Sequence, residues 1–252
     1  AAQYMATAKN GPAAGPPTHL HAAPGAANCH RNPTTGRMPM ATPTPVVLLH
    51  AFPLNAAMWA RQVETLAPRK VLAPHFPGFG GRPPGEATLD AFARAVLSDM
   101  DAAGIGRAVV VGLSLGGYTA LRLHALAPER VAGMVLADPR AGADDEAGRA
   151  KRTDQAARAR REGVGWLAEA MVPALLGATT RRERPGVVEE VRGLVAQAEA
   201  EGVARALEAM RDRPDSLPGL GAIRVPVLVL VGEEDALTPP AESRKIAEGV
   251  PD

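Results

Sequence analysis

Hydrophobic residues follow two different patterns along the chain from residue 46 onward. Short continuous runs of aliphatic and β-branched residues alternate with longer segments in which apolar residues recur at spacings of three and four. Continuous apolar runs are typical of strands buried on both faces of a parallel sheet, and the three-and-four spacing is typical of helices that cover such a sheet. The pattern predicts an α/β fold with a mostly parallel, doubly wound sheet. The predicted strands are 46–50, 71–73, 108–112, 133–137 and 227–231, and the predicted crossover helices are 59–67, 86–103 and 115–127.

Two segments depart from this alternation. Residues 1–40 are dominated by Ala, Pro, Gly, Thr and Asn without an apolar period, so they cannot bury enough surface to offset the entropy of ordering, and we predict a disordered tail. Residues 140–215 hold helical patterns with no convincing strand between them, which predicts an inserted helical cap. The predicted core then consists of residues 41–139 and 216–252.

Composition and charge narrow the classes of partner. The chain has 28 basic and 27 acidic residues and a formal net charge of +1, so it has no overall field that would attract nucleic acid or an anionic membrane. Basic residues gather at 149–161, but acidic residues interleave with them, which indicates a solvated helix face with ion pairs. No apolar run approaches the roughly 20 residues of a membrane-spanning helix. We therefore expect a cytoplasmic protein that binds a small molecule, with its oligomeric state left open.

Potential metal ligands gather in the predicted tail. Cys29 is the single cysteine of the chain, so it cannot form an internal disulfide. His19, His21 and His30 lie near it, but their spacing fits no closed zinc pattern. We expect neither a metal nor another cofactor.

The most informative chemical motif lies directly after the predicted strand 108–112. Gly112-Leu113-Ser114-Leu115-Gly116 matches G-x-S-x-G between a strand and a helix, the context in which this motif exposes a nucleophilic serine at a sharp turn. The two glycines supply the small residues that such a turn needs, and the backbone N–H of Leu115 would face a developing oxyanion. A nucleotide-binding turn is the alternative, but its G-x-G-x-x-G pattern needs glycine where Ser114 stands.

With this motif, residues 46–252 resemble the α/β-hydrolase superfamily, in particular serine hydrolases with a helical cap such as small-molecule esterases and enol-lactonases. The segment 47–54, Val-Leu-Leu-His-Ala-Phe-Pro-Leu, resembles the family's strand ending in His-Gly-x-x, with Ala51 in place of the usual glycine. The resemblance implies an α/β-hydrolase fold and a second oxyanion donor in the backbone N–H of Phe52. It also implies that His50 is a packing residue at the strand end.

A second motif resembles the family's loop that carries the catalytic acid. Gly232-Glu233-Glu234-Asp235 follows the predicted strand 227–231. The resemblance implies that Asp235 would accept a hydrogen bond from the catalytic imidazole and stabilise the imidazolium. Asp138, just after an earlier strand, stands at the position that some relatives use; we favour Asp235 for its fuller motif and for the chain order serine, acid, histidine. A loop aspartate that only caps a helix is the alternative for either residue.

The family's histidine should follow one further strand, yet no histidine follows His124 in this sequence. His124 lies ten residues beyond Ser114 in the predicted helix, roughly 15 Å along its axis, so it cannot act as the base. His75 would follow a different strand from the family histidine. The strand 227–231 would also remain an uncovered apolar edge, which invites pairing with other chains. We therefore expect a chain truncated before the last strand, helix and histidine, in preference to a protein that lacks the histidine altogether.

These inferences predict that the full-length protein is a serine hydrolase. It would cleave an ester, lactone or related acyl bond of a small molecule through an acyl-enzyme on Ser114. The chain as given would retain at most traces of activity, because removal of a triad member leaves only oxyanion-hole and binding contributions. Trp166 in the predicted cap is either a pocket wall or a core residue. The alternative function is a non-catalytic ligand-binding protein of the same fold without the histidine.

Overall fold

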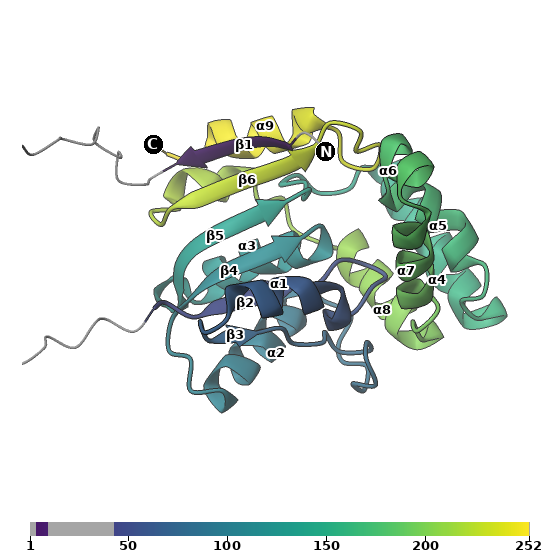
Figure 1. The fold of residues 1–252 in the computed structure, drawn as a ribbon, viewed down its shortest axis with the longest axis horizontal. Helices are drawn as coiled ribbons and strands as arrows, with labels where there is room; N and C mark the ends of the chain where they lie inside the picture. The colour runs from purple at the N-terminus through teal and green to yellow at the C-terminus, as the bar shows by residue number, and fades with distance from the viewer. Residues whose placement is uncertain (1–3, 10–42, 252) are drawn as a thin grey trace, which may run out of the picture.

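A six-stranded sheet in the order β1-β6-β5-β4-β2-β3 forms the centre of the protein in a computed structural model that describes residues 4–9 and 43–251. The strands β2 to β6 run parallel to one another, and helices flank the sheet (Figure 1), which confirms the predicted doubly wound α/β class. The strands are β1 Tyr4–Lys9, β2 Val46–Leu49, β3 Val71–Leu72, β4 Ala108–Leu113, β5 Val131–Ala137 and β6 Val227–Gly232.

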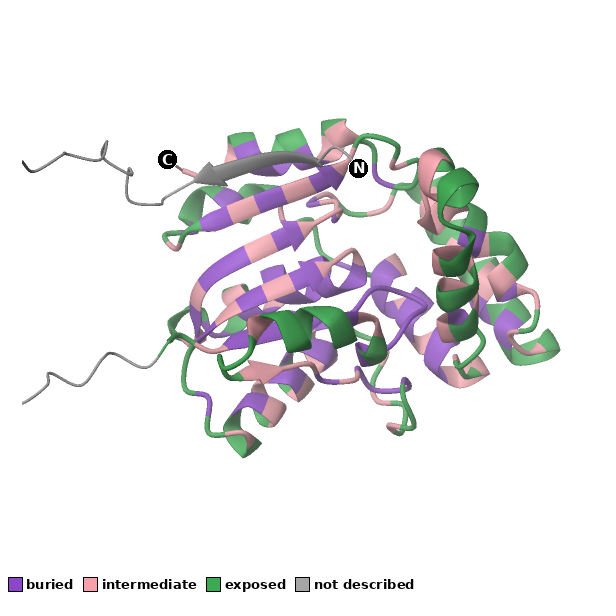
Figure 2. Ribbon diagram, viewed as in Figure 1, coloured by how far each residue is buried: buried purple, intermediate pink, exposed green. Residues whose placement is uncertain are grey.

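Alternate residues of the strands build hydrophobic layers on the two faces of the sheet. Val47 and Leu49 belong to a large core cluster, whereas Val46 and Leu48 join Trp59 in a smaller one. Because successive side chains of a strand point to opposite faces, the two clusters lie on opposite sides of β2. Figure 2 shows the alternation of buried and half-buried positions along the strands. The elements that cover the sheet are η1 Ala56–Trp59, α1 Ala60–Leu66, α2 Leu89–Ala102, α3 Leu115–Leu126, η2 Pro128–Arg130, η3 Leu217–Ala222 and α9 Pro240–Gly249.

Five helices lie between β5 and β6 in the chain, inside the segment 140–215 predicted as a cap. They sit beyond the carboxyl ends of the parallel strands, on one side of the molecule (Figure 1). The first and the last of them pack against each other. We refer to these helices as the helical insertion: α4 Glu146–Glu162, α5 Leu167–Leu175, α6 Ala178–Glu183, α7 Pro185–Val195 and α8 Ala200–Arg211.

Two of the contacts that hold the helical insertion on the core involve the segments after β2 and β3. Gly202 in α8 lies against Gly78, so closely that a Cβ on Gly202 would overlap the Gly78 carbonyl. Gly78 itself has a φ of +86°, a conformation that favours glycine. The side chain of Asn55, just before η1, donates a hydrogen bond of 3.0 Å to the Gln197 side chain between α7 and α8. The insertion is therefore attached to the core on the side of β2 and β3.

The basic stretch at the start of the insertion forms ion pairs, as the interleaved charges predict. Arg158 pairs with Glu162 within α4, and Arg160 pairs with Glu201 and Glu208 of α8. These pairs are largely exposed, so each contributes little to stability. In the part of the chain that the structure describes, no helix is both long and apolar enough to cross a membrane.

The start of the chain differs from the prediction. Tyr4–Lys9 forms β1, antiparallel to β6, with Tyr4 opposite Gly232 and Lys9 opposite Val227. These six residues are therefore not a disordered tail. Residues 1–3 and 10–40 of the predicted tail lie outside the described residues, and so do the cysteine and the histidines that were considered as metal ligands. β6 has β5 on one side and β1 on the other, so the expected uncovered edge is absent from the described sheet. The local sequence did not predict this strand. Its strand conformation depends on pairing with β6, which lies more than 200 residues away in the sequence.

Candidate functional site

The candidate nucleophile and the two candidate acids lie at the carboxyl ends of three neighbouring strands. Ser114 follows β4, Asp138 follows β5, and Asp235 belongs to the loop after β6. Because β4, β5 and β6 are adjacent and parallel, the loops that follow them meet at one edge of the sheet, where open α/β folds bind ligands. The helical insertion lies over the same edge (Figure 1).

Ser114 occupies a strained turn between β4 and α3. Its φ is +51° and its ψ is −108°, and its N–H donates a hydrogen bond of 2.8 Å to the Ala137 carbonyl. A positive φ is costly for a residue with a Cβ and is often found at functional sites. The glycines on either side permit the turn, because a Cβ on Gly112 would overlap the Gly116 carbonyl and a Cβ on Gly116 would overlap the Leu49 carbonyl.

Ser114 opens into a cavity of about 240 Å³, which we call the serine cavity. The helical insertion supplies most of its wall, and the core supplies Phe52, Ser114, Tyr118 and the segment at Leu237 and Thr238. Asp235 is not among its lining residues, although Thr238 lies only three positions later. The serine cavity is lined by Phe52, Ser114, Tyr118, Arg140, Asp144, Gly148, Lys151, Arg152, Gln155, Met171, Leu175, Leu207, Met210, Leu237 and Thr238.

The two residues predicted as oxyanion donors stand beside this cavity. Leu115 is the first residue of α3, so its N–H has no acceptor within the helix. The N–H of Phe52 makes no hydrogen bond with any residue of the described chain, whereas the N–H of the preceding Ala51 is occupied by the Met58 sulfur at 3.3 Å. Backbone donors without partners at the end of a strand and at the start of a helix are the kind that can bind an oxyanion.

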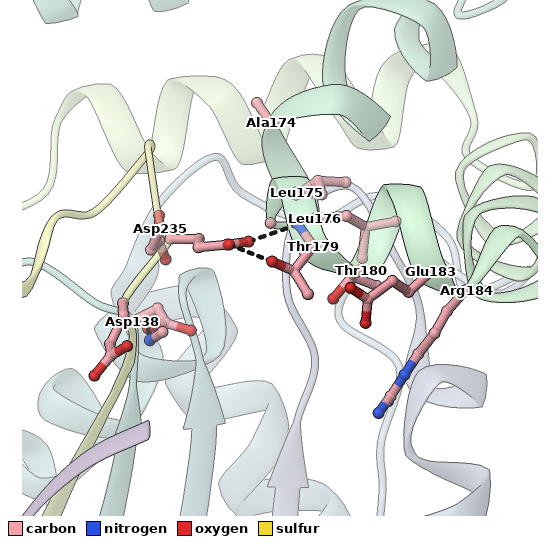
Figure 3. Close-up of a pocket in the computed structure, with 13 residues that line it drawn as sticks. Asp138, Ala174, Leu175, Leu176, Thr179, Thr180, Glu183, Arg184 and Asp235 are labelled. Carbon is pink, nitrogen blue, oxygen red and sulfur yellow. Dashed lines mark hydrogen bonds between the residues drawn. The ribbon is translucent and has the colours of Figure 1, made fainter. Parts of the chain in front are cut away.

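The two candidate acids line a second, neighbouring cavity of about 320 Å³, which we call the acidic cavity. Leu175 lines both cavities, so they adjoin. Figure 3 shows Asp138 and Asp235 on the core side of the acidic cavity and Thr179 of α6 on the insertion side. The N–H and hydroxyl of Thr179 donate to the Glu234 carboxylate at 2.9 and 2.6 Å, which ties α6 to the loop after β6.

Asp138 and Asp235 face each other in different environments. Asp138 has a φ of +52°, and its Oδ1 accepts a hydrogen bond of 3.2 Å from the Gly232 N–H. Burial, and then the neighbouring charge of Asp235, raise the pKa of Asp138 to about 6. Oδ1 of Asp235 accepts from the N–H groups of Leu237 and Thr238 at 2.8 and 2.7 Å, which fixes the turn before α9. Asp235 thus stabilises the turn before α9 and does not cap the helix itself, whose N-cap is Pro239. Its carboxylate also interacts with that of Asp138.

The comparison with known proteins decides the family. The sequence model of the alpha/beta hydrolase fold matches residues 44–252. The chain belongs to this family. Among solved structures it is similar to a thermophilic esterase from Thermogutta terrifontis with malate bound, at 41% identity and a TM-score of 0.80, over 83% of this chain and 79% of the esterase.

Two further relatives belong to the same group of hydrolases. The enol-lactonase from Burkholderia xenovorans LB400 is 30% identical, with a TM-score of 0.75, over 82% of this chain and 79% of the lactonase. The pimeloyl-[acyl-carrier protein] methyl ester esterase of Aromatoleum aromaticum is 30% identical over 222 residues, which is 82% of this chain and 86% of the esterase. Esterases and a lactonase among its relatives support hydrolase activity on small-molecule esters.

The histidines of the described part of this hydrolase do not line either cavity. His50 is fully buried; its ring lies 3.0 Å from the Ala51 carbonyl and accepts the Phe76 N–H at 3.0 Å. Burial above all lowers the pKa of His50 to about 4, so the ring is neutral and acts as a packing residue at neutral pH. His75 accepts the Ala56 N–H at 3.2 Å, and His124 is half-buried within α3.

Several residues around the serine cavity of this hydrolase were not predicted as site residues. Arg140, Lys151 and Arg152 line it, and Asp144 lies between Arg152 and the buried Arg213. The basic stretch of the sequence was the available signal, but its even mixture of charges indicated only a solvated face. Trp166 lies outside both cavities; its Nε1 donates to the Gly163 carbonyl and its ring lies under Arg158.

Proposed function

We propose that the hydrolase chemistry of this protein is that of a serine hydrolase, which cleaves an ester or lactone through an acyl-enzyme on Ser114. The observation that carries the proposal is the strained Ser114, held at the end of β4 by Gly112 and Gly116 and open to the serine cavity. A serine in a sparsely populated backbone conformation, directed into a cavity of small-molecule size, is expected of a nucleophile.

The proposed reaction has two stages. Oγ of Ser114 attacks the substrate carbonyl carbon and gives its proton to a base, while the N–H groups of Phe52 and Leu115 stabilise the tetrahedral oxyanion. Collapse of this intermediate breaks the bond to the alcohol oxygen, which takes up the proton. A water then attacks the acyl-enzyme in the same way, releases the acid and restores the serine hydroxyl. The scheme applies to esters and to lactones alike, since they differ only in whether the two products remain joined.

Asp235 would orient and stabilise the imidazolium of the base in this scheme, and Asp138 is the alternative acid. Of the described histidines, His50 is occupied by two backbone groups and neither His75 nor His124 lines the serine cavity. We therefore expect this chain to hydrolyse activated esters only in traces, because none of the described histidines is placed to act as a base for the serine.

Chemical rescue tests the proposal on the chain itself. Hydrolysis of 4-nitrophenyl butanoate would be measured with increasing imidazole, which can act as a general base from solution. We expect a rate above background that rises with imidazole and is lost in Ser114→Ala, with a butanoyl adduct on Ser114 detected by mass spectrometry. Ser216→Ala is the matched control, because Ser216 lies in neither cavity. Equal imidazole-dependent rates in the wild type and Ser114→Ala would overturn the proposal.

The second candidate function is ligand binding without chemistry. It is favoured by one observation: none of the residues that line the serine cavity is a histidine. This function predicts that small esters bind in the cavity and that imidazole produces no Ser114-dependent turnover.

A further inference from the structure

The serine cavity carries an excess of positive charge. Arg140, Lys151 and Arg152 line it, and Asp144 is the single acidic residue among its lining residues. A cavity with such an imbalance favours an anionic ligand only if the cations are not already paired with acidic side chains of the protein. The partners of each charged group therefore decide whether the excess is available to a ligand.

Asp144 is already committed to two other cations. Its carboxylate pairs with Arg152 and, at 2.7 Å, with Arg213, and the side chains of Asp144 and Arg213 are only 5% and 2% exposed. Burial alone would raise the pKa of Asp144, but hydrogen bonds from Arg213 and Arg152 outweigh burial and lower it. Arg213 also lies over the Tyr118 ring at 4.7 Å. Asp144 thus balances a buried arginine and Arg152, and no acidic side chain of the lining is left for the other two cations.

Lys151 differs from every other basic residue of α4. Each arginine of that helix has an acidic partner: Arg149 pairs with Asp212, Arg152 with Asp144, Arg158 and Arg161 with Glu162, and Arg160 with Glu201 and Glu208. No acidic group of residues 43–251 lies within ion-pair distance of the Lys151 ammonium, and Lys151, like Arg152, lines the serine cavity.

Arg140, the other cation of the lining, also has no acidic partner in the described chain. Its Nη2 donates a hydrogen bond of 2.7 Å to the Leu237 carbonyl, which positions the guanidinium and leaves its other N–H groups available. Met171, Leu175 and Leu207 line the same cavity and provide an apolar path within it. A ligand that fits this lining has an aliphatic part and one anionic end.

We propose that Arg140 and Lys151 form a subsite for a carboxylate, which the substrate carries at the end of a short aliphatic spacer from its reacting bond. The identity of that bond, an ester or lactone cleaved at Ser114, rests on the proposed function. The subsite makes the protein selective for half-esters of dicarboxylic acids, or lactones with a free carboxylate, over neutral esters of the same length.

Calorimetric binding of two esters of equal chain length tests the subsite. Monomethyl adipate carries a carboxylate where methyl hexanoate carries a methyl group. At pH 7.5 we expect monomethyl adipate to bind about 10-fold more tightly or better, the effect of one or two partly exposed ion pairs. Lys151→Met and Arg140→Met should each reduce its affinity by about 3- to 10-fold and leave methyl hexanoate unchanged. Lys245→Met, on α9 and paired with Glu242, is the control that should change neither.

Equal affinities for the two esters, or equal losses for both in Lys151→Met and Arg140→Met, would overturn the subsite. Repeating the titrations in Ser114→Ala separates the two proposals, because binding does not need the nucleophile. Selective binding of monomethyl adipate without imidazole-dependent turnover would leave the subsite standing and overturn the acyl-enzyme. Imidazole-dependent turnover with no preference between the two esters would leave the acyl-enzyme standing and overturn the subsite.

Discussion

Gly202 of α8 rests directly on the backbone of Gly78, whose carbonyl occupies the space that a Cβ on Gly202 would need. This contact joins the helical insertion to the core loop that follows β3. It sets how closely α8 approaches the sheet, and with it the height of the cavity wall that Leu207 and Met210 of the same helix provide.

Gly202→Ala is expected to lower the free energy of unfolding by about 1–3 kcal/mol, because the added methyl group must push α8 away from Gly78. Urea unfolding of the whole chain measures it. The control is Gly193→Ala in α7, where an added Cβ meets open space. There, alanine should be neutral or stabilise the helix by up to about 1 kcal/mol. Equal effects of the two substitutions would contradict the contact.

Gly116→Ala tests the turn at Ser114. A Cβ at this position would overlap the Leu49 carbonyl at the end of β2, a backbone atom that cannot rotate away. We expect a loss of about 1–3 kcal/mol in the free energy of unfolding and loss of the imidazole-dependent activity. Gly106→Ala, which meets no atom within 4 Å, should retain both. A stable, active Gly116→Ala variant would show that the turn and the end of β2 can move apart without loss of function.

Arg213→Met removes the buried partner of Asp144. The carboxylate would remain buried beside Arg152 alone, and breaking a buried pair by removing one partner typically costs about 3–5 kcal/mol. Arg211→Met is the comparison, because Arg211 pairs with the more exposed Asp212. That change should stay within about 0.5 kcal/mol. Thermal and urea unfolding of both variants measure the loss in free energy of unfolding. A small effect of Arg213→Met would mean that water reaches Asp144.

Asp138→Asn tests the carboxylate pair. The pKa of Asp138 is raised to about 6 in the folded protein, so the folded state binds more protons than the unfolded state between roughly pH 4 and pH 6. The contribution of Asp138 to the free energy of unfolding therefore falls as the pH rises through that window. The asparagine lacks this loss and can still accept the Gly232 N–H. Relative to the wild type, Asp138→Asn should gain about 1–2 kcal/mol between pH 4.5 and pH 7.5.

His50 acts in the opposite direction in the same experiment. Its pKa is lowered to about 4, so the unfolded state binds more protons between roughly pH 4 and pH 6.5, and stability from His50 falls as the pH falls. Only the difference between Asp138→Asn and the wild type isolates Asp138. Asp154→Asn on the exposed face of α4 provides the baseline for a carboxylate-to-amide change. Parallel pH profiles for wild type and Asp138→Asn would contradict the raised pKa.

The class of fold and the position of the strained serine could be predicted from the amino-acid sequence, because both follow from short-range patterns. The predicted strands 46–50 and 108–112 coincide closely with β2 and β4, and the glycines around Ser114 act within five residues of it. Apolar runs report burial on both faces, and a strand–glycine–serine–helix turn is a local backbone geometry.

The features that join distant segments could not be predicted from the sequence and became apparent in the three-dimensional fold. The pairing of Tyr4–Lys9 with β6 and the burial of Arg213 against Asp144 connect residues whose separation in sequence carries no periodic signal. The structure also distinguishes Lys151, which has no acidic partner in the described chain, from the paired arginines of α4. Whether a helix face is a solvated surface or a cavity wall depends on which segments pack opposite to it. The sequence gives the sign of the charge on a side chain. Whether that charge is paired depends on which other segments of the chain lie next to it in the fold.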